Sequence, residues 1–115
     1  MRLTIVDREK SLTAEQREFA ERRLMFALAR FESRIQRVKV VVNDVNGPRG
    51  GVDQHCRITV QLRRMRDVVV SNRDVDLKNC VARAADRAGR AVARAVDRFH
   101  QFDRVPASRT QTAWS

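Results

Sequence analysis

The chain has little of the material from which catalytic and cofactor sites are built. Its 115 residues include two cysteines, two histidines and four glycines. Cys56 and Cys80 form no C-x-x-C motif, and each falls within an apolar pattern, so we expect both to be buried as small hydrophobic residues. No serine stands at a recognisable spacing from a base, and no glycine loop has the pattern of a phosphate-binding turn. The sequence therefore predicts no catalysis, no metal site, no cofactor and no small-molecule substrate.

Long apolar runs are also missing. No stretch approaches the roughly 20 apolar residues that a membrane-spanning helix needs, and the N-terminal residues, MRLTIVDREK, become charged too early for a signal peptide. The basic segment near the C-terminus has no Trp or Phe before Phe99, so its apolar side would insert poorly into a membrane surface. We therefore expect a cytoplasmic protein with no membrane partner.

Positive charge is what the chain has in excess. Lys and Arg total 24 against 14 Asp and Glu, which gives a formal net charge of +10, and only Lys10, Lys39 and Lys78 are lysines. The guanidinium group of arginine presents a planar fork of donors that fits phosphate oxygens in pairs and stacks on bases, so the composition points to nucleic acid. GC-rich coding would also explain the preference for arginine over lysine, so the inference depends on the sign of the charge.

Five arginines in the last third of the chain recur with the period of one helical face. They are spaced 4, 3, 4 and 4 residues apart, which aligns them as a single stripe along a helix. Apolar residues recur at the same period on the opposite side, and we expect this seam to face the core. The arginine stripe consists of Arg83, Arg87, Arg90, Arg94 and Arg98, and the apolar seam of Leu77, Val81, Ala84, Ala88, Ala91, Val92 and Ala95.

The acidic residues near the arginine stripe are too few to neutralise it. We expect Asp86 to pair within the helix with Arg83 and Arg90 at i+3 and i+4 spacing, and Asp97 adds one more carboxylate. A stripe that was only a solvated face would have an acidic partner at every turn. We therefore interpret the stripe as a binding surface, with the solvated face as the alternative.

The first part of the chain predicts a strand followed by a helix. A short alternating pattern marks a strand over residues 3–6. Thr13 and Gln16 have the spacing of a capping box, and apolar residues then recur at threes and fours to about residue 31 or 33, which predicts an amphipathic helix. Arginines gather toward its end, namely Arg23, Arg30, Arg34 and Arg37.

Period-two patterns predict three further strands, from Ile35, over residues 55–63 and over residues 68–70. The segment 46–53, NGPRGGVD, has three glycines and a proline in eight residues and predicts a loop. The final helix should begin at Leu77, after Asp74 or Asp76 as its cap, and end near residue 99 or 102.

The resulting order, β-α-β-β-β-α, predicts an α+β fold. A right-handed crossover makes the first two strands parallel, and the rest of the sheet is a meander. One polar sheet face and two amphipathic helices predict a four-stranded mixed sheet with both helices packed on one face. The arginine-bearing surfaces of the two helices would then meet, and a groove between them would focus the positive field. We expect one domain over residues 1–102 and a flexible tail over residues 103–115, with Trp114 an exposed terminal residue rather than an anchor.

Four segments of the chain form an ordered set. They are REFAERRLMFALARFESRI at the first helix, VKVVVNDVNGPRGG at the second strand and loop, CRITVQL in the third strand and DVDLKNCVARAADRAGRAVAR in the last helix. In this order the chain resembles the ribosome hibernation promoting factor family, also called protein Y or sigma-54 modulation proteins. The resemblance implies a partner, the small ribosomal subunit, whose ribosomal RNA meets basic helix surfaces in the channel of messenger and transfer RNA. It also implies that the protein inhibits or protects idle ribosomes, and we expect a monomer when it is free.

Carried over by position, the resemblance assigns RNA contacts to arginines of both helices. Asp74 and Asp76 match the acidic residues that precede the family's last helix, whereas Lys78 stands where many relatives have tyrosine. The chain ends at Ser115 without the second domain of long members, so we expect a short form, for which pairing of ribosomes is not implied. The matching RNA-binding positions are Arg83, Arg87, Arg90 and Arg94 in the last helix, which Arg98 extends, and Arg22, Arg23, Arg30 and Arg34 at the first helix.

Two other functions remain open at this point. A double-stranded RNA-binding module also packs two helices on a sheet, but it begins with its helix and carries a lysine-rich cluster where this chain has Asp-Val-Asp-Leu at 74–77. A structure without the strand at 3–6 would favour that module. The second alternative is a regulator of transcription that acts through protein contact, as the older sigma-54 name suggests.

Overall fold

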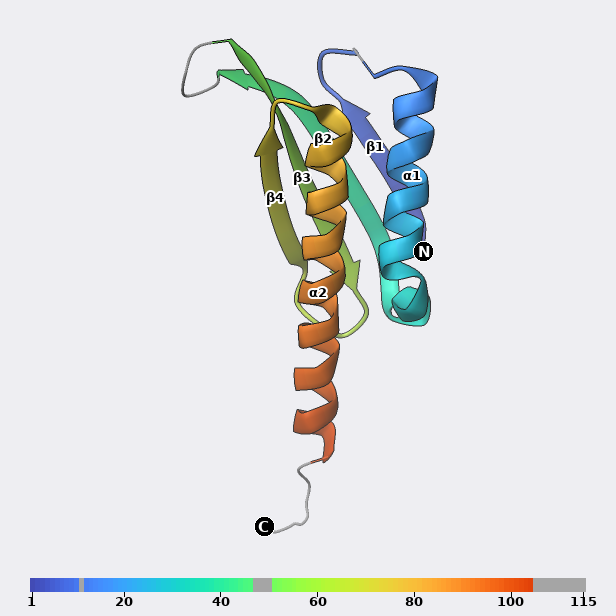
Figure 1. The fold of residues 1–115 in the computed structure, drawn as a ribbon. Helices are drawn as coiled ribbons and strands as arrows, with labels where there is room; N and C mark the ends of the chain where they lie inside the picture. Colours follow the sequence, from blue (N-terminus) through green and yellow to red (C-terminus); the bar gives the residue numbers. More distant parts are fainter. Residues whose placement is uncertain (11, 47–50, 105–115) are drawn as a thin grey trace.

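The computed structural model describes residues 1–10, 12–46 and 51–104. Residues 47–50 of the predicted loop and the predicted tail from residue 105, with Trp114, lie outside the described residues. The described elements follow the predicted order β-α-β-β-β-α, with a short 3₁₀ helix, η1, after the first helix (Figure 1). Their bounds are β1 Arg2–Asp7, α1 Ala14–Leu28, η1 Ala29–Arg34, β2 Ile35–Asn46, β3 Val52–Leu62, β4 Val68–Asp74 and α2 Leu77–Arg104.

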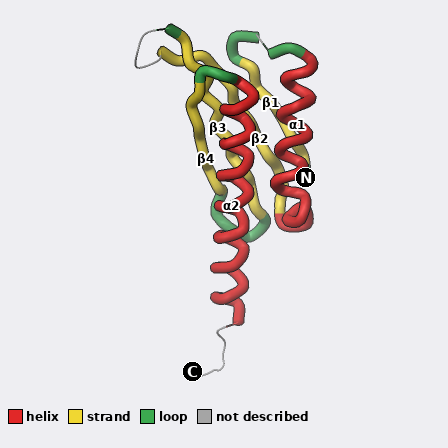
Figure 2. Tube along the Cα trace, in the orientation of Figure 1, coloured by secondary structure: helices red, strands yellow, loops and turns green. Residues whose placement is uncertain are grey.

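The four strands form one mixed sheet in the order β1-β2-β3-β4. β1 is parallel to β2, as the right-handed crossover through α1 requires, and the other two pairs are antiparallel. Both helices lie on the same face of the sheet, begin at the same end of the molecule and run in the same direction (Figures 1 and 2). The predicted α+β class and topology are therefore confirmed, and β1 before the first helix excludes the order of a double-stranded RNA-binding module.

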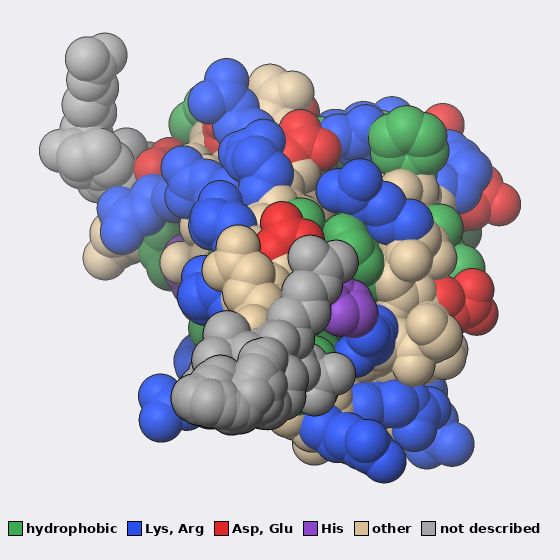
Figure 3. All heavy atoms as spheres, turned by 90° about the horizontal axis from the view of Figure 1, so that it is seen from below, with side chains coloured by type: hydrophobic (Ala, Val, Ile, Leu, Met, Phe, Trp, Pro, Cys, Tyr) green, Lys and Arg blue, Asp and Glu red, His purple; other side chains and the backbone are tan. Residues whose placement is uncertain are grey.

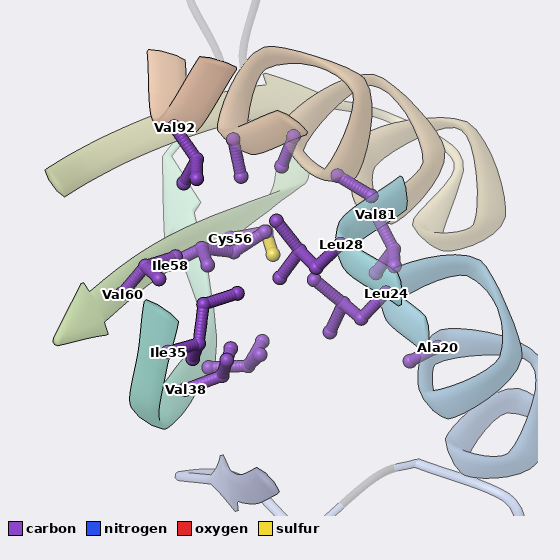
Figure 4. Close-up of a cluster of buried hydrophobic side chains, with 14 of the residues drawn as sticks. Ala20, Leu24, Leu28, Ile35, Val38, Cys56, Ile58, Val60, Val81 and Val92 are labelled. Carbon is purple, nitrogen blue, oxygen red and sulfur yellow. The ribbon is translucent and has the colours of Figure 1, made fainter. Parts of the chain in front are cut away.

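The core lies between the apolar face of the sheet and the two helices (Figure 4). Alternate residues of β2 and β3 point toward the helices, and the buried side chains are mostly Val, Ile and Leu. Each such side chain contributes about 1.5–3 kcal/mol when fully buried. The core consists of Ala20, Leu24, Leu28, Ile35, Val38, Val40, Val42, Cys56, Ile58, Val60, Leu62, Leu77, Cys80, Val81, Ala84, Ala85, Ala88, Val92 and Val96.

The predicted apolar seam of α2 is confirmed for five of its seven residues. Ala91 and Ala95 are only half-buried, while Cys80, Ala85 and Val96 complete the buried side of the helix. Most of these residues are small, so α2 lies close to its neighbours. At Gly89 an added Cβ would come within 3.1 Å of the Ala27 carbonyl oxygen of α1. The glycine, which costs about 1 kcal/mol of helix propensity against alanine, therefore permits the close contact between the two helices.

Side chains cap the N-termini of both helices, as the sequence predicts. The Thr13 hydroxyl accepts from the Gln16 amide, and the Gln16 side chain accepts from the Thr13 amide, both at 3.0 Å. Of the two predicted caps of α2, the cap is Asp76, whose carboxylate accepts a hydrogen bond from the Asn79 amide at 2.9 Å. Asp74 instead accepts from the Asp76 amide at 3.0 Å and so stabilises the turn before the helix.

Several element boundaries differ from the sequence-based prediction. β2 reaches Asn46 and β3 begins at Val52, so both ends of the predicted loop 46–53 belong to strands, because β2 and β3 stay paired there. α1 ends at Leu28, and residues 29–34 tighten into a 3₁₀ helix, which turns the chain into β2 at the fully buried Ile35. β4 continues from residue 70 to Asp74 because its backbone stays paired with β3, although the apolar pattern has ended. α2 extends to Arg104, beyond residue 99 or 102, where the helical spacing of apolar residues predicts its end.

The two cysteines are free thiols in the core, as predicted, and both side chains have zero exposed fraction. Burial raises the pKa of Cys56 from 9.0 to about 12. Burial, together with the charge of Asp74, raises the pKa of Cys80 to about 11. Both groups therefore remain neutral thiols in the folded protein at pH 8, where a thiolate-selective reagent finds almost no reactive form.

We predict that a maleimide or disulfide reagent at pH 8 labels neither cysteine in the native protein and both in urea. Because folding raises both pKa values above 9.0, the free energy of unfolding should stay constant below about pH 9 and fall as the pH rises toward 11. Denaturant titrations from pH 7 to 10.5 measure this loss. Rapid labelling of the native protein would contradict the burial of the two thiols.

Candidate nucleic-acid interface

All five residues of the arginine stripe are exposed on α2, on the side away from the core. Among the described residues, none of them forms an ion pair with a carboxylate. The Arg87 Nη1 donates to the Ser71 carbonyl oxygen of β4 at 2.9 Å, so the stripe is turned toward the β4 edge of the sheet. Seen along the molecule, Lys and Arg side chains gather over much of the visible face, with few Asp or Glu between them (Figure 3).

The expected pairing of Asp86 within α2 is wrong. Its Oδ1 accepts instead from Nη2 of Arg23 on α1, at 3.0 Å. At 3.6 residues per turn, Asp86 points to the flank of α2 that faces α1, whereas Arg83 and Arg90 lie farther around the helix. The carboxylate thus links the two helices and leaves the arginine stripe without the partner that the sequence suggested.

Two of the predicted RNA-binding arginines make contacts between helices. Arg23 is the partner of Asp86, and its side chain is 32% exposed. Arg34 at the end of η1 lies with Nη2 3.1 Å from His100 Nε2, and its guanidinium group is 5.4 Å from the centre of the Phe99 ring. Both residues therefore fix α1 and η1 to α2, and their donors are only partly available to a partner.

The other two predicted RNA-binding arginines near the first helix, Arg22 and Arg30, are exposed. Arg22 pairs with Glu18 at 3.2 Å, but both side chains are about two-thirds exposed, and pairs of this kind contribute little to stability. The Arg30 guanidinium lies 4.7 Å from the centre of the Phe31 ring. A phosphate could replace either contact at small cost.

The two groups of arginines do not form the walls of one groove. α1 and α2 meet directly at Gly89, and the Arg23–Asp86 pair bridges them. Since the arginine stripe is turned toward β4, the helices present two neighbouring basic surfaces with an ion pair between them. The expectation of a field-focusing groove between the helices is corrected accordingly.

A depression of about 500 Å³ lies at the far end of the arginine stripe. It is formed by the β3–β4 turn and the end of α2, with Arg98, Arg64 and Arg66 on its rim. The two turn arginines were not predicted as site residues because a turn has no periodicity to mark its outward side. They extend the positive surface beyond the helix.

Phe26 is the other residue that the sequence analysis missed. Its side chain is 81% exposed, and Met25 beside it is 43% exposed. Phe26 on α1 is four residues from Arg22 on the same helix and four from Arg30 in η1, and it borders a largely apolar depression of about 590 Å³. A usable signal was present, since Phe26 falls outside the apolar period of this helix.

Among the described residues, the side chains able to bind a metal ion are dispersed. No group of three or more His, Cys, Asp or Glu side chains among them could hold a metal ion. His55 Nδ1 lies 3.3 Å from Asn43 Oδ1 on the sheet, and His100 is occupied by Arg34. Within the described part of the chain, no helix has the length and apolarity to cross a membrane.

We predict that Asp86→Ala lowers the free energy of unfolding by about 0.5 kcal/mol, the range of a partly exposed ion pair. Arg23→Ala should then add little to this loss, so a double-mutant cycle gives a coupling energy of similar size. Asp97→Ala is the control, because Asp97 is exposed on α2 and should change stability little. Coupling of Asp86 to Arg90 instead would contradict the interhelical pair.

Comparisons with known proteins agree with this architecture. A family model described as "Sigma 54 modulation protein / S30EA ribosomal protein" matches residues 3–100. The crystal structure of the Thermus thermophilus protein Y N-terminal domain is similar with a TM-score of 0.67 and 26% identity, over 82% of this chain and 98% of that chain. A ribosomal subunit interface protein from Coxiella burnetii shares the fold, with a TM-score of 0.69 and 12% identity over 84% of this chain and 99% of that chain. No curated protein matches the sequence significantly.

Proposed function

Because the chain belongs to the sigma 54 modulation protein / S30EA ribosomal protein family, we propose that it binds ribosomal RNA of the small subunit through the basic surface of its helices. The observation that carries this proposal is the arginine stripe, five exposed guanidinium groups without an acidic partner among the described residues. The protein would occupy the channel of messenger and transfer RNA and so inhibit or protect idle ribosomes. The Coxiella burnetii protein with this fold is named for the interface of ribosomal subunits, which agrees with such a position.

The chemistry of the stripe suits phosphate rather than a single carboxylate. Its residues repeat once per helical turn, about 5–6 Å apart, so several phosphates of one RNA backbone can be bound in succession. Guanidinium groups bind phosphate oxygens in pairs, and binding releases the counterions of each neutralised phosphate. Arg64 and Arg66 of the β3–β4 turn would extend this surface, and Arg22 of α1 with Arg30 of η1 would form the neighbouring one.

A protein-contact role in transcription is the second candidate, because the family description also names sigma 54 modulation. The helix surface argues against it as the main activity. The cores of protein interfaces are rich in aromatic and other apolar side chains, whereas the five members of the arginine stripe are adjacent like charges with no aromatic residue among them. A phosphate-rich partner fits that stripe better.

We predict that Arg90→Glu/Arg94→Glu weakens binding to purified small subunits by at least 100-fold at about 0.1 M salt. Among the described residues these two arginines form no side-chain hydrogen bond or ion pair, unlike Arg87, so circular dichroism and the melting point should stay near the wild-type values. If about five phosphates are neutralised, a plot of the logarithm of the wild-type binding constant against the logarithm of the salt concentration should have a slope of about −3.5 to −4.5.

Lys10→Glu is the matched control, since Lys10 is exposed in the β1–α1 connection and away from the stripe. It should change the affinity only a few-fold. Wild-type binding by the stripe variant, or a salt slope near zero, would reject the proposed mechanism. Competition with messenger RNA for the subunit tests channel occupancy separately.

Phe26 gives a prediction of a different kind. An exposed aromatic ring between two arginines is suited to stack on an unpaired base, and such stacking is worth about 1–3 kcal/mol. Phe26→Ala should therefore weaken subunit binding by about 10-fold or more, without a change in stability or in the salt slope. Phe26→Trp should retain the affinity. Equal affinities for all three proteins would remove Phe26 from the site.

A further inference from the structure

The face of the sheet opposite the helices carries its own set of cations. Side chains alternate along each strand, so the residues between the buried residues of β2 and β3 point away from α1 and α2. No helix covers this face among the described residues (Figure 2). Every strand contributes at least one exposed basic residue to it. We call this set the basic diagonal; it consists of Arg2 on β1, Arg37 and Lys39 on β2, Arg57 on β3 and Arg73 on β4.

The strand register places these residues in one continuous band. Arg2 lies directly opposite Arg37, and Lys39 follows two residues along the same strand. Arg57 is the diagonal neighbour of Lys39, and Arg73 is the diagonal neighbour of Arg57. Directly opposite residues have Cβ atoms about 5 Å apart and diagonal neighbours about 7–8 Å apart. The band therefore crosses the whole sheet from corner to corner with a cation at every step.

The repulsion among these cations is not compensated by ion pairs among the described residues. Like charges directly opposite each other, such as Arg2 and Arg37, destabilise a sheet. Among the described residues no member of the basic diagonal forms an ion pair. The only carboxylate that alternation places on this face is Asp53, near the start of β3. A surface that keeps repelling charges without internal compensation is suited to an anionic partner.

The open face also has the shape and polar groups for such a partner. A depression of about 480 Å³ is bordered by Arg57, Arg73 and Arg8, with His55 and Asn43 among its polar lining residues. A second depression, of about 240 Å³, is bordered by Arg2 and Arg37 near the other end of the band. The cations are therefore accompanied by neutral hydrogen-bonding side chains and by concave surface.

We propose that the basic diagonal is a second RNA-binding surface, which holds the sugar-phosphate backbone of an extended RNA strand on the side opposite the arginine stripe. The domain would then be held between two RNA segments, one on each face. This inference rests on the proposed function for the identity of the RNA, and adds a contact surface to it. The band ascends by six residues while crossing three strand spacings, a path of about 25 Å, which matches the backbone of several nucleotides.

The composition of the face favours RNA backbone over bases or protein. The described face has no Phe, Tyr or Trp, so it lacks both the stacking platforms that bind unpaired bases and the aromatic residues enriched at protein interfaces. Recognition would be independent of sequence and strongly dependent on salt. The helix side, with Phe26 beside arginines, would supply any contact to bases.

Binding to purified small subunits with Lys39→Glu/Arg57→Glu tests the proposal. Loss of two phosphate contacts should reduce the magnitude of the salt slope by about 1.5 and weaken binding about 30-fold at about 0.1 M salt. Lys39→Glu alone is compared with Lys10→Glu, a matched lysine reversal outside both surfaces. If either variant at Lys39 or Arg57 fails the circular dichroism check, the glutamine substitutions replace it.

Tethered hydroxyl-radical cleavage gives an independent readout. Cys56 and Cys80 are buried, so a probe attaches only to an introduced cysteine: Gln61→Cys on the open sheet face or Asn79→Cys on α2. We expect the two probes to cut different segments of the ribosomal RNA. Cleavage from α2 alone, with wild-type affinity of the sheet variant, would overturn the second surface while the proposed function stands. Failure of the wild-type protein to bind subunits would instead reject the proposed function itself.

Discussion

The close contact of α2 with its neighbours is the constraint on which the rest of the molecule depends. The helix reaches the sheet and α1 through alanines, Gly89 and a few valines, so little space is left between them. Such a contact can accommodate no long side chain, and the dense packing of protein interiors penalises any that is forced in. The five arginines of the stripe are consequently directed outward, and the same seam that stabilises the fold creates the arginine stripe.

The sequence predicted the fold well because its signals are local or have one topological solution. The alternation of valines in β2, the capping box at Thr13 and the helical period of α2 each depend on neighbours in the chain. Where pairing partners determine the structure, prediction was poorer. The last residues of β4 are held by backbone hydrogen bonds to β3. The end of α1 is determined by the burial of Ile35, which begins the next strand.

The site shows the same limit more strongly. The five stripe arginines could be found from period alone, since each lies opposite a buried residue of its own helix. Tertiary contacts determine how far Arg23 and Arg34 are available to a partner, and their own contacts, Asp86 and His100, are more than 60 residues away along the chain. The basic diagonal could not be found from one strand, because no strand carries more than two of its cations. It emerges only when the register aligns four strands.

The common direction of the two helices also separates charge along the molecule. Acidic residues stand where the helices begin, with Glu15 in the first turn of α1 and Asp74 and Asp76 before α2. The arginine stripe follows farther along α2, and Arg64 and Arg66 of the β3–β4 turn lie beside Arg98 near the end of that helix. The protein is therefore an electric dipole as well as a cation, and a highly charged anionic surface exerts a torque on it before any contact forms. The arginine-rich end turns toward that surface during the approach, so encounter selects an orientation that short-range contacts then only have to complete.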